Sequence, residues 1–236
     1  MEIIMKRVLL KLSGEALANG SGGVYDADFV DRVAEAIKAA SDTGLEIAIV
    51  VGAGNIWRGR QGSDMDRVEA DRMGMLATVI NSIYVKDALI RAGADAVVMS
   101  SVPMSPLAED YSSDVAKKYL REGKVVVFGC GLGIPFLSTD TAGAVKAAEI
   151  SADAMYMAKN IDYIYTDDPR KNPNATKLER VKASEVLAMN LKAIDATATA
   201  FCMSNGMPIH VFGLKNPEDI TKALSGRTVG TVVLAE

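Results

Sequence analysis

Short apolar runs recur along the chain, and longer segments with helical periodicity separate them. The runs are rich in β-branched residues and continuous rather than alternating, which is typical of strands buried on both faces of a sheet. They lie at 7–12, 46–51, 96–99, 124–128, 154–158 and 208–212. Helical patterns occupy 27–43, 68–91, 112–122, 141–150, 183–205 in two pieces, and 216–224. This alternation predicts an α/β fold with a mainly parallel central sheet covered on both faces by helices.

The predicted helix at 68–91 has a wide apolar surface. Its apolar residues cover about half of the circumference, more than the stripe of roughly 100° on an ordinary surface helix. They are Met73, Met75, Leu76, Val79, Ile80, Ile83 and Tyr84. Burial within one subunit is the simpler explanation, and an interface between subunits is the alternative.

The 236 residues contain no internal repeat, low-complexity tract or flexible linker. Glycine follows four predicted helices, where a left-handed terminus favours it, at Gly44, Gly93, Gly123 and Gly206. The turn-rich segment 160–177 is a candidate boundary. We expect a single domain over 1–236, with an N-terminal lobe of about 1–159 and a C-terminal lobe of about 160–236.

Composition narrows the class of protein. With 49% hydrophobic and 24% charged residues, the chain has material for a large core and differs from disordered proteins. The net charge of −4 lacks the basic field that drives nucleic-acid binding. One histidine, His210, and two cysteines, Cys130 and Cys202, exclude a usual zinc site, an iron–sulfur cluster and a disulfide framework.

The sequence also argues against secretion and membrane insertion. Three apolar residues between Arg7 and Lys11 are fewer than the core of a signal peptide. The longest uncharged run, 196–214, contains polar residues, a proline and a histidine, and would make a poor membrane span. We expect a cytoplasmic protein that binds neither membrane nor nucleic acid.

A lysine stands inside the first predicted strand, just before a Ser-Gly step. Lysine is seldom fully buried without an anionic partner. A phosphate is a good candidate, because Lys11 supplies a point charge while Ser13 and Gly14 offer hydroxyl and backbone N–H donors. An edge-strand lysine that reaches solvent explains the sequence equally well.

The loop after the second strand, 52–60, opens with Gly-Ala-Gly and has Asp71 about 20 residues downstream, as in dinucleotide-binding folds. Trp57 occupies the position of the third glycine, so a nicotinamide-dependent dehydrogenase is a disfavoured alternative. What remains is flexible backbone next to Arg58, which suits phosphoryl oxygens.

The loop after the strand at 124–128 carries alternate glycines, followed by Ser138, Thr139 and Asp140 at a helix start. A helix N-cap and a first-turn carboxylate explain these three residues without a ligand. Three glycine-bearing strand ends in one sheet nevertheless predict a polyphosphate site, because glycine costs stability unless backbone must approach a ligand. The only Gly-Lys pair, at 123–124, begins a strand, so the site is not a Walker P-loop.

Phosphoryl transfer also fits the scarcity of histidine, because it depends on positioning and charge neutralisation more than on proton transfer. An acceptor that is a phosphate monoester is largely dianionic at pH 7 and needs no general base.

Five segments carry a resemblance to a known family: VLLKLSGEAL (8–17), GNIWRG (54–59), DRMGMLATV (71–79), PFLSTDTA (135–142) and the Asp168-Pro169 step. They are similar to the amino acid kinase superfamily and, within it, to the bacterial UMP kinases, from Arg7 to about Val233. The resemblance implies transfer of the ATP γ-phosphate to UMP, with Mg²⁺, in pyrimidine nucleotide biosynthesis. It also implies a three-layer αβα fold, a homohexamer, and GTP and UTP as effectors.

The resemblance further implies roles for single residues: Lys11 would neutralise developing charge, Asp140 would orient Lys11, and Arg58 would bind phosphate. The C-terminal lobe would form the ATP side. The residues that would bind ATP are Lys11, Ser13, Gly14, Gly54, Arg58, Asn160, Tyr165 and Asp168. The UMP side, in the N-terminal lobe, would comprise Gly52, Ala53, Asp71, Leu132, Gly133, Ile134, Pro135, Phe136, Leu137, Ser138 and Thr139. No protein-bound metal is implied.

Several positions depart from the family pattern. Ala53 replaces a glycine of GGGN, which requires a negative φ at this residue. Leu132 and Ile134 replace the threonine and asparagine of GTGNPF, and Tyr163 and Asp167 replace a glycine and an alanine. Two alternatives therefore stay open: a nucleotide-binding sensor or storage protein with this fold, and a different phosphotransferase of the superfamily.

Overall fold

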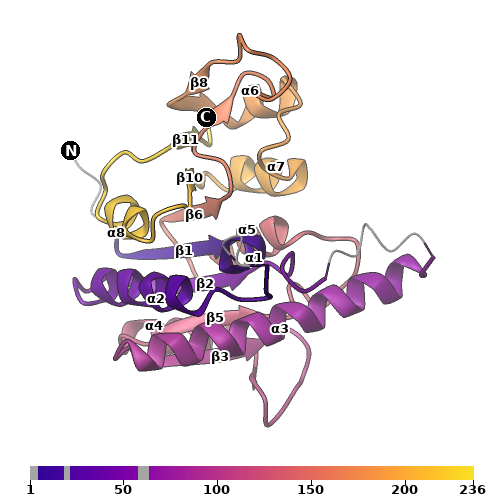
Figure 1. Ribbon diagram of the computed structural model, residues 1–236. Coiled ribbons are helices and arrows are strands. Elements are labelled where there is room, and N and C mark those ends of the chain that lie inside the picture. Colours follow the sequence, from indigo (N-terminus) through magenta and orange to yellow (C-terminus); the bar gives the residue numbers. More distant parts are fainter. Residues whose placement is uncertain (1–4, 19–21, 58–63) are drawn as a thin grey trace.

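The computed structural model describes residues 5–18, 22–57 and 64–236. They form three layers, a central sheet with helices on each of its two faces (Figure 1). Nine strands pair in the order β4-β3-β5-β2-β1-β6-β10-β11-β9, and β7 and β8 form a separate antiparallel pair. The strands are β1 (Arg7–Leu12), β2 (Glu46–Val51), β3 (Ala96–Ser100), β4 (Glu109–Asp110), β5 (Val125–Gly129), β6 (Ala154–Lys159), β7 (Ile164–Tyr165), β8 (Lys177–Leu178), β9 (Arg180–Lys182), β10 (Ile209–Gly213) and β11 (Thr231–Leu234).

Helices cover both faces of this sheet. They are α1 (Gly14–Ala18), α2 (Ala27–Ser41), α3 (Arg67–Arg91), α4 (Ser113–Arg121), α5 (Thr139–Glu149), α6 (Ala183–Ala188), α7 (Ala196–Ser204) and α8 (Glu218–Leu224). Successive strand residues face opposite layers, as the pleat requires. Leu10 therefore joins the core with α2, α3 and α8, and Leu9 joins the core with α4, α5, α6 and α7.

The predicted fold class is confirmed. All six predicted strands and all seven predicted helices are present, with ends displaced by at most two residues. Neighbouring strands from β4 to β10 are parallel, and β11 runs antiparallel to β10. Sequence patterns missed α1, β4, β7, β8, β9 and β11. These elements have two to five residues, which is too short for a periodicity to emerge.

Local chemistry explains where the helices begin and end. Ser138 is the N-cap of α5 and accepts a hydrogen bond from the Thr141 N–H at 3.1 Å, so the capping interpretation of this residue is confirmed. The four glycines expected at helix termini all have positive φ, between 65° and 89°.

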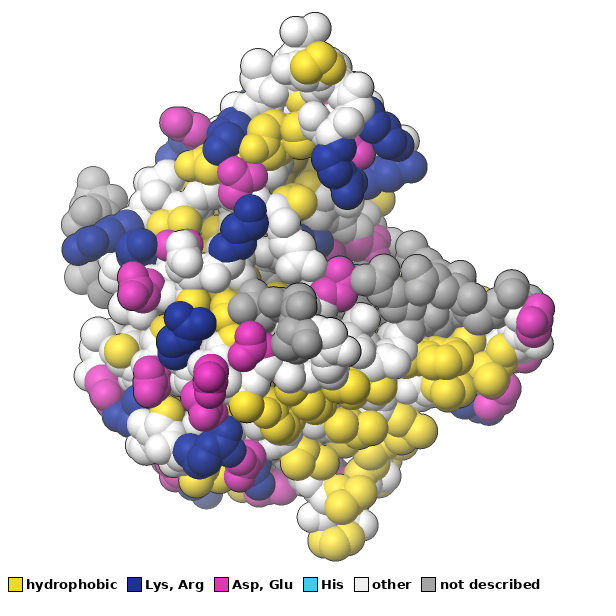
Figure 2. Space-filling model, in the orientation of Figure 1, with side chains coloured by type: hydrophobic (Ala, Val, Ile, Leu, Met, Phe, Trp, Pro, Cys, Tyr) yellow, Lys and Arg dark blue, Asp and Glu magenta, His cyan; other side chains and the backbone are white. Residues whose placement is uncertain are grey.

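Helix α3 has two dissimilar sides. Val79, Val85 and Leu89 are buried on the sheet side. The opposite side is exposed and apolar, and we call Met73, Leu76, Ile80 and Ile83 its outer face. Figure 2 shows apolar side chains gathered over α3 and the loop that follows β3. Among the described residues, α3 alone is long and apolar enough to cross a membrane by length and composition, but its buried side packs on the sheet like a core helix.

Candidate functional site

The loops after β1, β2 and β6 meet at one edge of the sheet. Leu12 is level with Val51 on one side and with Ala158 on the other, so the three parallel strands end together. The first two loops touch: a Cβ on Gly14 would lie 2.3 Å from the Gly52 carbonyl oxygen. Glycine is therefore required at 14 for the two loops to approach this closely.

A buried cluster of charges lies where these strands end. The Asp140 carboxylate accepts from Lys11 Nζ at 2.9 Å and from Lys159 Nζ at 2.7 Å, one through each oxygen. Lys159 also donates to the Ala193 carbonyl at 2.6 Å. Burial raises the pKa of Asp140, but the charges of Lys11 and Lys159 outweigh burial and lower it to about 2. Asp140 is thus an ionised counter-ion between two lysines.

Sequence reasoning missed Lys159. The signal was available, because this lysine ends the buried strand AMYMAK just as Lys11 lies within the buried strand RVLLKL. Burial lowers the pKa of Lys159, and Asp140 only partly offsets the effect. Two ammonium groups share one carboxylate, so the cluster carries a net positive charge suited to an anion.

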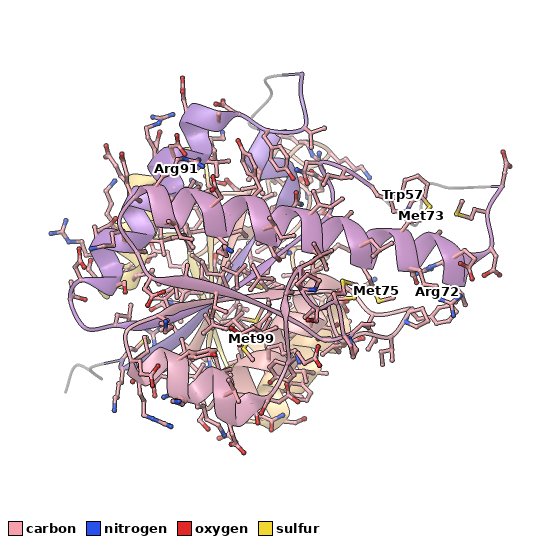
Figure 3. All side chains as sticks on the ribbon, turned by 90° about the horizontal axis from the view of Figure 1, so that it is seen from below. Trp57, Arg72, Met73, Met75, Arg91 and Met99 are labelled. Atoms are coloured by element: carbon pink, nitrogen blue, oxygen red, sulfur yellow. The ribbon has the colours of Figure 1, made fainter. Side chains whose placement is uncertain are left out.

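A cavity of about 190 Å³ lies beside this cluster, between the strand-end loops and α3. It brings together seven of the residues expected to bind UMP: Ala53, Asp71, Leu132, Ile134, Leu137, Ser138 and Thr139. Gly54, expected on the ATP side, lines it as well. Trp57, Gly74, Met75 and Thr78 also line the cavity and were not expected there. Figure 3 shows Trp57 beside the amino-terminal half of α3, near Met73.

Four residues expected on the UMP side do not line this cavity: Gly52, Gly133, Pro135 and Phe136. Phe136 has a positive φ of 71° and is 60% exposed, yet its N–H donates to Asp71 Oδ2 at 2.8 Å. Arg67 pairs with the same carboxylate oxygen at 2.9 Å and lies over the Phe136 ring. Asp71 therefore links α3 to the loop before α5.

The residues expected around ATP are less tightly gathered. The Asn160 side chain donates to Glu15 Oε2 at 3.1 Å, which ties the end of β6 to α1. The Tyr165 hydroxyl donates to Asp162 at 3.0 Å, and Asp168 pairs with Arg170 at 3.1 Å. All of these contacts are at the surface.

Ala53 is not one of the described non-glycine residues that have a positive φ. It therefore has the negative φ that alanine requires at this position of the loop. Gly52 donates its own N–H to the Leu12 carbonyl at 2.9 Å, so this N–H is already used within the protein. Arg58 lies outside the described residues. Within the described part of the chain, no three histidine, cysteine, aspartate or glutamate side chains gather as a metal site.

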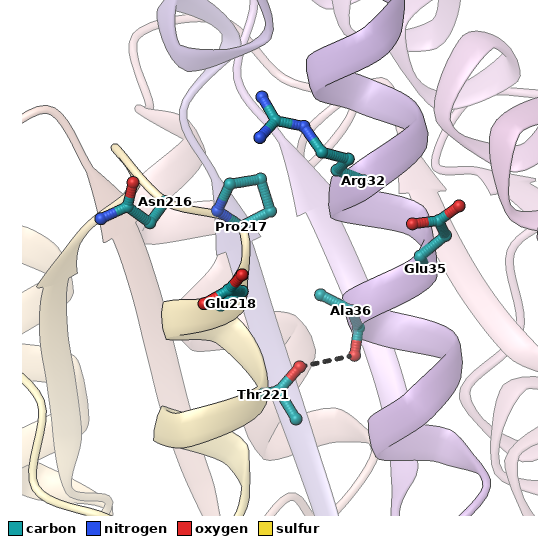
Figure 4. Close-up of a pocket in the computed structure, with 7 residues that line it drawn as sticks. All are labelled: Arg32, Glu35, Ala36, Asn216, Pro217, Glu218 and Thr221. Carbon is teal, nitrogen blue, oxygen red and sulfur yellow. Dashed lines mark hydrogen bonds between the residues drawn. The ribbon is translucent and has the colours of Figure 1, made fainter.

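A larger cavity, of about 490 Å³, lies between α2 and α8 (Figure 4). Its charged lining is Arg32, Glu35 and Glu218, and Thr221 donates to the Ala36 carbonyl at 3.3 Å across it. Two carboxylates and one guanidinium do not suit a polyphosphate, whereas the smaller cavity adjoins two lysines and glycine loops. We therefore take the strand ends, rather than the larger cavity, as the candidate functional site.

Comparison with known proteins shows the family to which the chain belongs. Residues 6–213 match the amino acid kinase family. The crystal structure of UMP kinase from Bacillus anthracis is 35% identical, with a TM-score of 0.94, over 98% of this chain and 97% of that chain. UMP kinase from Ureaplasma parvum is 34% identical, with a TM-score of 0.91, over 98% and 100%. Uridylate kinase from Archaeoglobus fulgidus, 24% identical with a TM-score of 0.72 over 96% and 99%, shares the fold. The chain belongs to the amino acid kinase family.

Proposed function

We propose that this protein is a UMP kinase, which transfers the γ-phosphate of ATP to UMP and yields ADP and UDP. The observation that carries the proposal is the Lys11–Asp140–Lys159 cluster at the meeting point of glycine-bearing loops. Similarity to two UMP kinases over nearly the whole chain supports the choice of UMP as acceptor. The pathway that such a reaction serves is pyrimidine nucleotide biosynthesis.

In this proposal the two lysines neutralise charge on the transferring phosphoryl group, and Asp140 holds them in place. Lys11 is buried and the Lys159 side chain is only 16% exposed, so the electrostatic effect of both on the phosphates is stronger than in water. UMP occupies the cavity lined by Asp71, Leu132 and Thr139, in the N-terminal lobe. ATP lies towards Asn160, Tyr165 and Asp168, in the C-terminal lobe that begins near residue 160.

Mg²⁺ enters this reaction with ATP. Asp140 is the one carboxylate of the charge cluster, and both of its oxygens are bound by lysines. Because Mg²⁺ keeps several waters and binds readily to nucleotide phosphates, an ion that arrives with ATP would be held chiefly by those phosphates. The single histidine takes no part: burial lowers the pKa of His210 to about 4, and its ring stacks on Tyr156.

We further propose that the protein is cytoplasmic and forms a homohexamer through the outer face of α3, with GTP and UTP as effectors. Leu76 and Ile80 on this face are each more than half exposed, which is costly for a monomer. Replacing Ile80 with glutamate should dissociate subunits in sedimentation experiments. Val115→Glu, on α4, is the matched control and should leave assembly intact.

A coupled ADP-release assay with UMP, CMP, dUMP and acetylglutamate tests the function. We expect turnover with UMP above the other acceptors. Turnover only with another acceptor would instead identify a different phosphotransferase of the family. Tight UMP or UTP binding without any turnover would identify a sensor or storage protein.

A further inference from the structure

A buried asparagine on α3 contacts the loop that follows β2. Asn81 is 0% exposed, and its Nδ2 donates to the Gly52 carbonyl at 2.7 Å and to Asn55 Oδ1 at 2.8 Å. Its Oδ1 accepts from the Tyr25 hydroxyl at 2.7 Å and from Asn55 Nδ2 at 3.2 Å. A side-chain amide has two donor and two acceptor positions, so the protein itself satisfies all four.

The bond to Gly52 fixes the orientation of one peptide group. The Gly52–Ala53 peptide is trans, so its carbonyl and the following N–H point in opposite directions. The carbonyl is turned towards Asn81 and towards the space that a Cβ on Gly14 would occupy. The Ala53 N–H is therefore turned away from both, and Ala53 lines the cavity proposed for UMP.

Without an anchor, this peptide group could turn over, because glycine at 52 imposes little restriction on its own ψ. The turned peptide would present a carbonyl dipole where the N–H had been, which repels an anion. Turning over would also change φ at Ala53 by about 180°, into the positive region that alanine disfavours. The Ala53 methyl and the Asn81 amide thus favour the same orientation.

We infer that Asn81 is a positioning residue, which holds the Gly52–Ala53 peptide so that the Ala53 N–H donates to the phosphate of the acceptor. The inference rests on the proposed function. It also gives a reason for the presence of a fully buried amide on helix α3.

The first test compares Asn81→Ala with Ser82→Ala. Ser82 is equally buried on the same helix, but its hydroxyl is hydrogen-bonded to the Thr78 and Phe128 carbonyls rather than to the 52–55 loop. We expect Asn81→Ala to raise KM for UMP about tenfold or more. A tenfold change corresponds to roughly 1.4 kcal/mol, which is within the range that one hydrogen bond contributes. Ser82→Ala should change KM less than about twofold at a similar loss of stability.

A second variant, Asn81→Asp, separates positioning from packing. A carboxylate cannot donate to the Gly52 carbonyl, whereas a protonated carboxyl can, and burial raises the pKa of such a group. The ratio of variant to wild-type kcat/KM should therefore rise as the pH falls from 8 to 6. For Asn81→Ala the same ratio should stay flat, and dividing by the wild type removes the ionisation of UMP itself.

The outcomes distinguish the two proposals. No UMP turnover by the wild type overturns the proposed function. An active wild type with normal KM in Asn81→Ala, or a flat ratio in Asn81→Asp, overturns the positioning role alone. If neither variant folds, a crystal structure of the wild type with UMP decides: an Ala53 N–H pointing away from the phosphate overturns the inference.

Discussion

The loops around the proposed UMP phosphate are held by buried hydrogen bonds, whereas the segment around the proposed ATP site is held by exposed ion pairs. Asn81 fixes Gly52, and Thr78 Oγ1 accepts from the Cys130 N–H at 2.9 Å, both from the buried side of α3. On the other side, Lys177 pairs with Asp162 at 2.9 Å, and both side chains are about half exposed.

The loss of a buried hydrogen bond and the loss of an exposed ion pair differ in how much they destabilise a protein. Leaving a buried donor or acceptor unsatisfied costs about 1–3 kcal/mol. Exposed ion pairs contribute about 1 kcal/mol or less and weaken with salt. The acceptor side is therefore preorganised, and the donor side is free to adjust to the nucleotide that arrives.

The lysine cluster should give the largest effect on activity. Lys11→Met and Lys159→Met each remove one buried charge while keeping much of the side-chain volume. Each should lower kcat by about 10³-fold or more, as expected for a cation that stabilises the transferring phosphoryl group. Steady-state assays with saturating ATP and UMP measure this, and near-normal turnover would remove that lysine from the chemistry.

The counter-ion of the two lysines should have the largest effect on stability. Asp140→Asn leaves two buried ammonium groups without a charge partner, and we expect a loss of about 3 kcal/mol or more in the free energy of unfolding. Asp162→Asn, the control on the donor side, should cost less than about 1 kcal/mol. Urea unfolding measures both, and equal losses would contradict the contrast between the two sides.

The stability of the protein at acid pH should also depend on Asp140. Because the pKa of Asp140 is about 2 in the folded protein, below its usual 3.8, its ionisation stabilises the fold above pH 4. That contribution is lost as the pH falls from about 4 to about 2. Unfolding free energies should therefore fall more steeply over this interval in the wild type than in Asp140→Asn.

Disturbing the close contact between the loops after β1 and β2 should have an intermediate effect on stability. Gly14→Ala would place a methyl group 2.3 Å from the Gly52 oxygen, and backbone must shift to relieve it. We expect a loss of about 1–3 kcal/mol in stability, with a raised KM for UMP. Gly74→Ala is the control, since its Cβ would meet only the Trp57 ring at 3.7 Å, and it should raise stability because Gly74 is helical. Destabilisation of both to the same degree would point to a general intolerance of alanine.

How much the sequence predicts also differs between the two sides. Continuous apolar strands, helix caps and glycine loops are enough to place Lys11, Gly14 and Asp140 at the carboxyl ends of the strands, because each rests on a local rule. The residues expected around UMP rest on the family resemblance. Lys159 was missed although its place at the end of a buried strand was visible, because its ion pair joins it to Asp140, 19 residues away. Asn81 was missed because its hydrogen bond to Gly52 spans 29 residues.

On the donor side, the sequence indicated a turn-rich segment but neither strand of the β7–β8 pair. Two-residue strands carry no periodicity, and their pairing, Ile164 with Leu178 and Tyr165 with Lys177, depends on a turn that spans eleven residues between them. The roles of Tyr165 and Asp168 rest on the family resemblance for the same reason.

The smallest expected effect belongs to Lys177, whose ammonium pairs with Asp162 and lies over the Tyr163 ring. The pair is at the surface, so Lys177→Met should raise KM for ATP by less than about threefold at low salt. The difference from the wild type should disappear near 0.5 M salt, where screening acts within a few ångströms. Titrating ATP in both proteins at two salt concentrations measures this. A large defect that persists in salt would mean that the donor side is as preorganised as the acceptor side, and the contrast between them would fail.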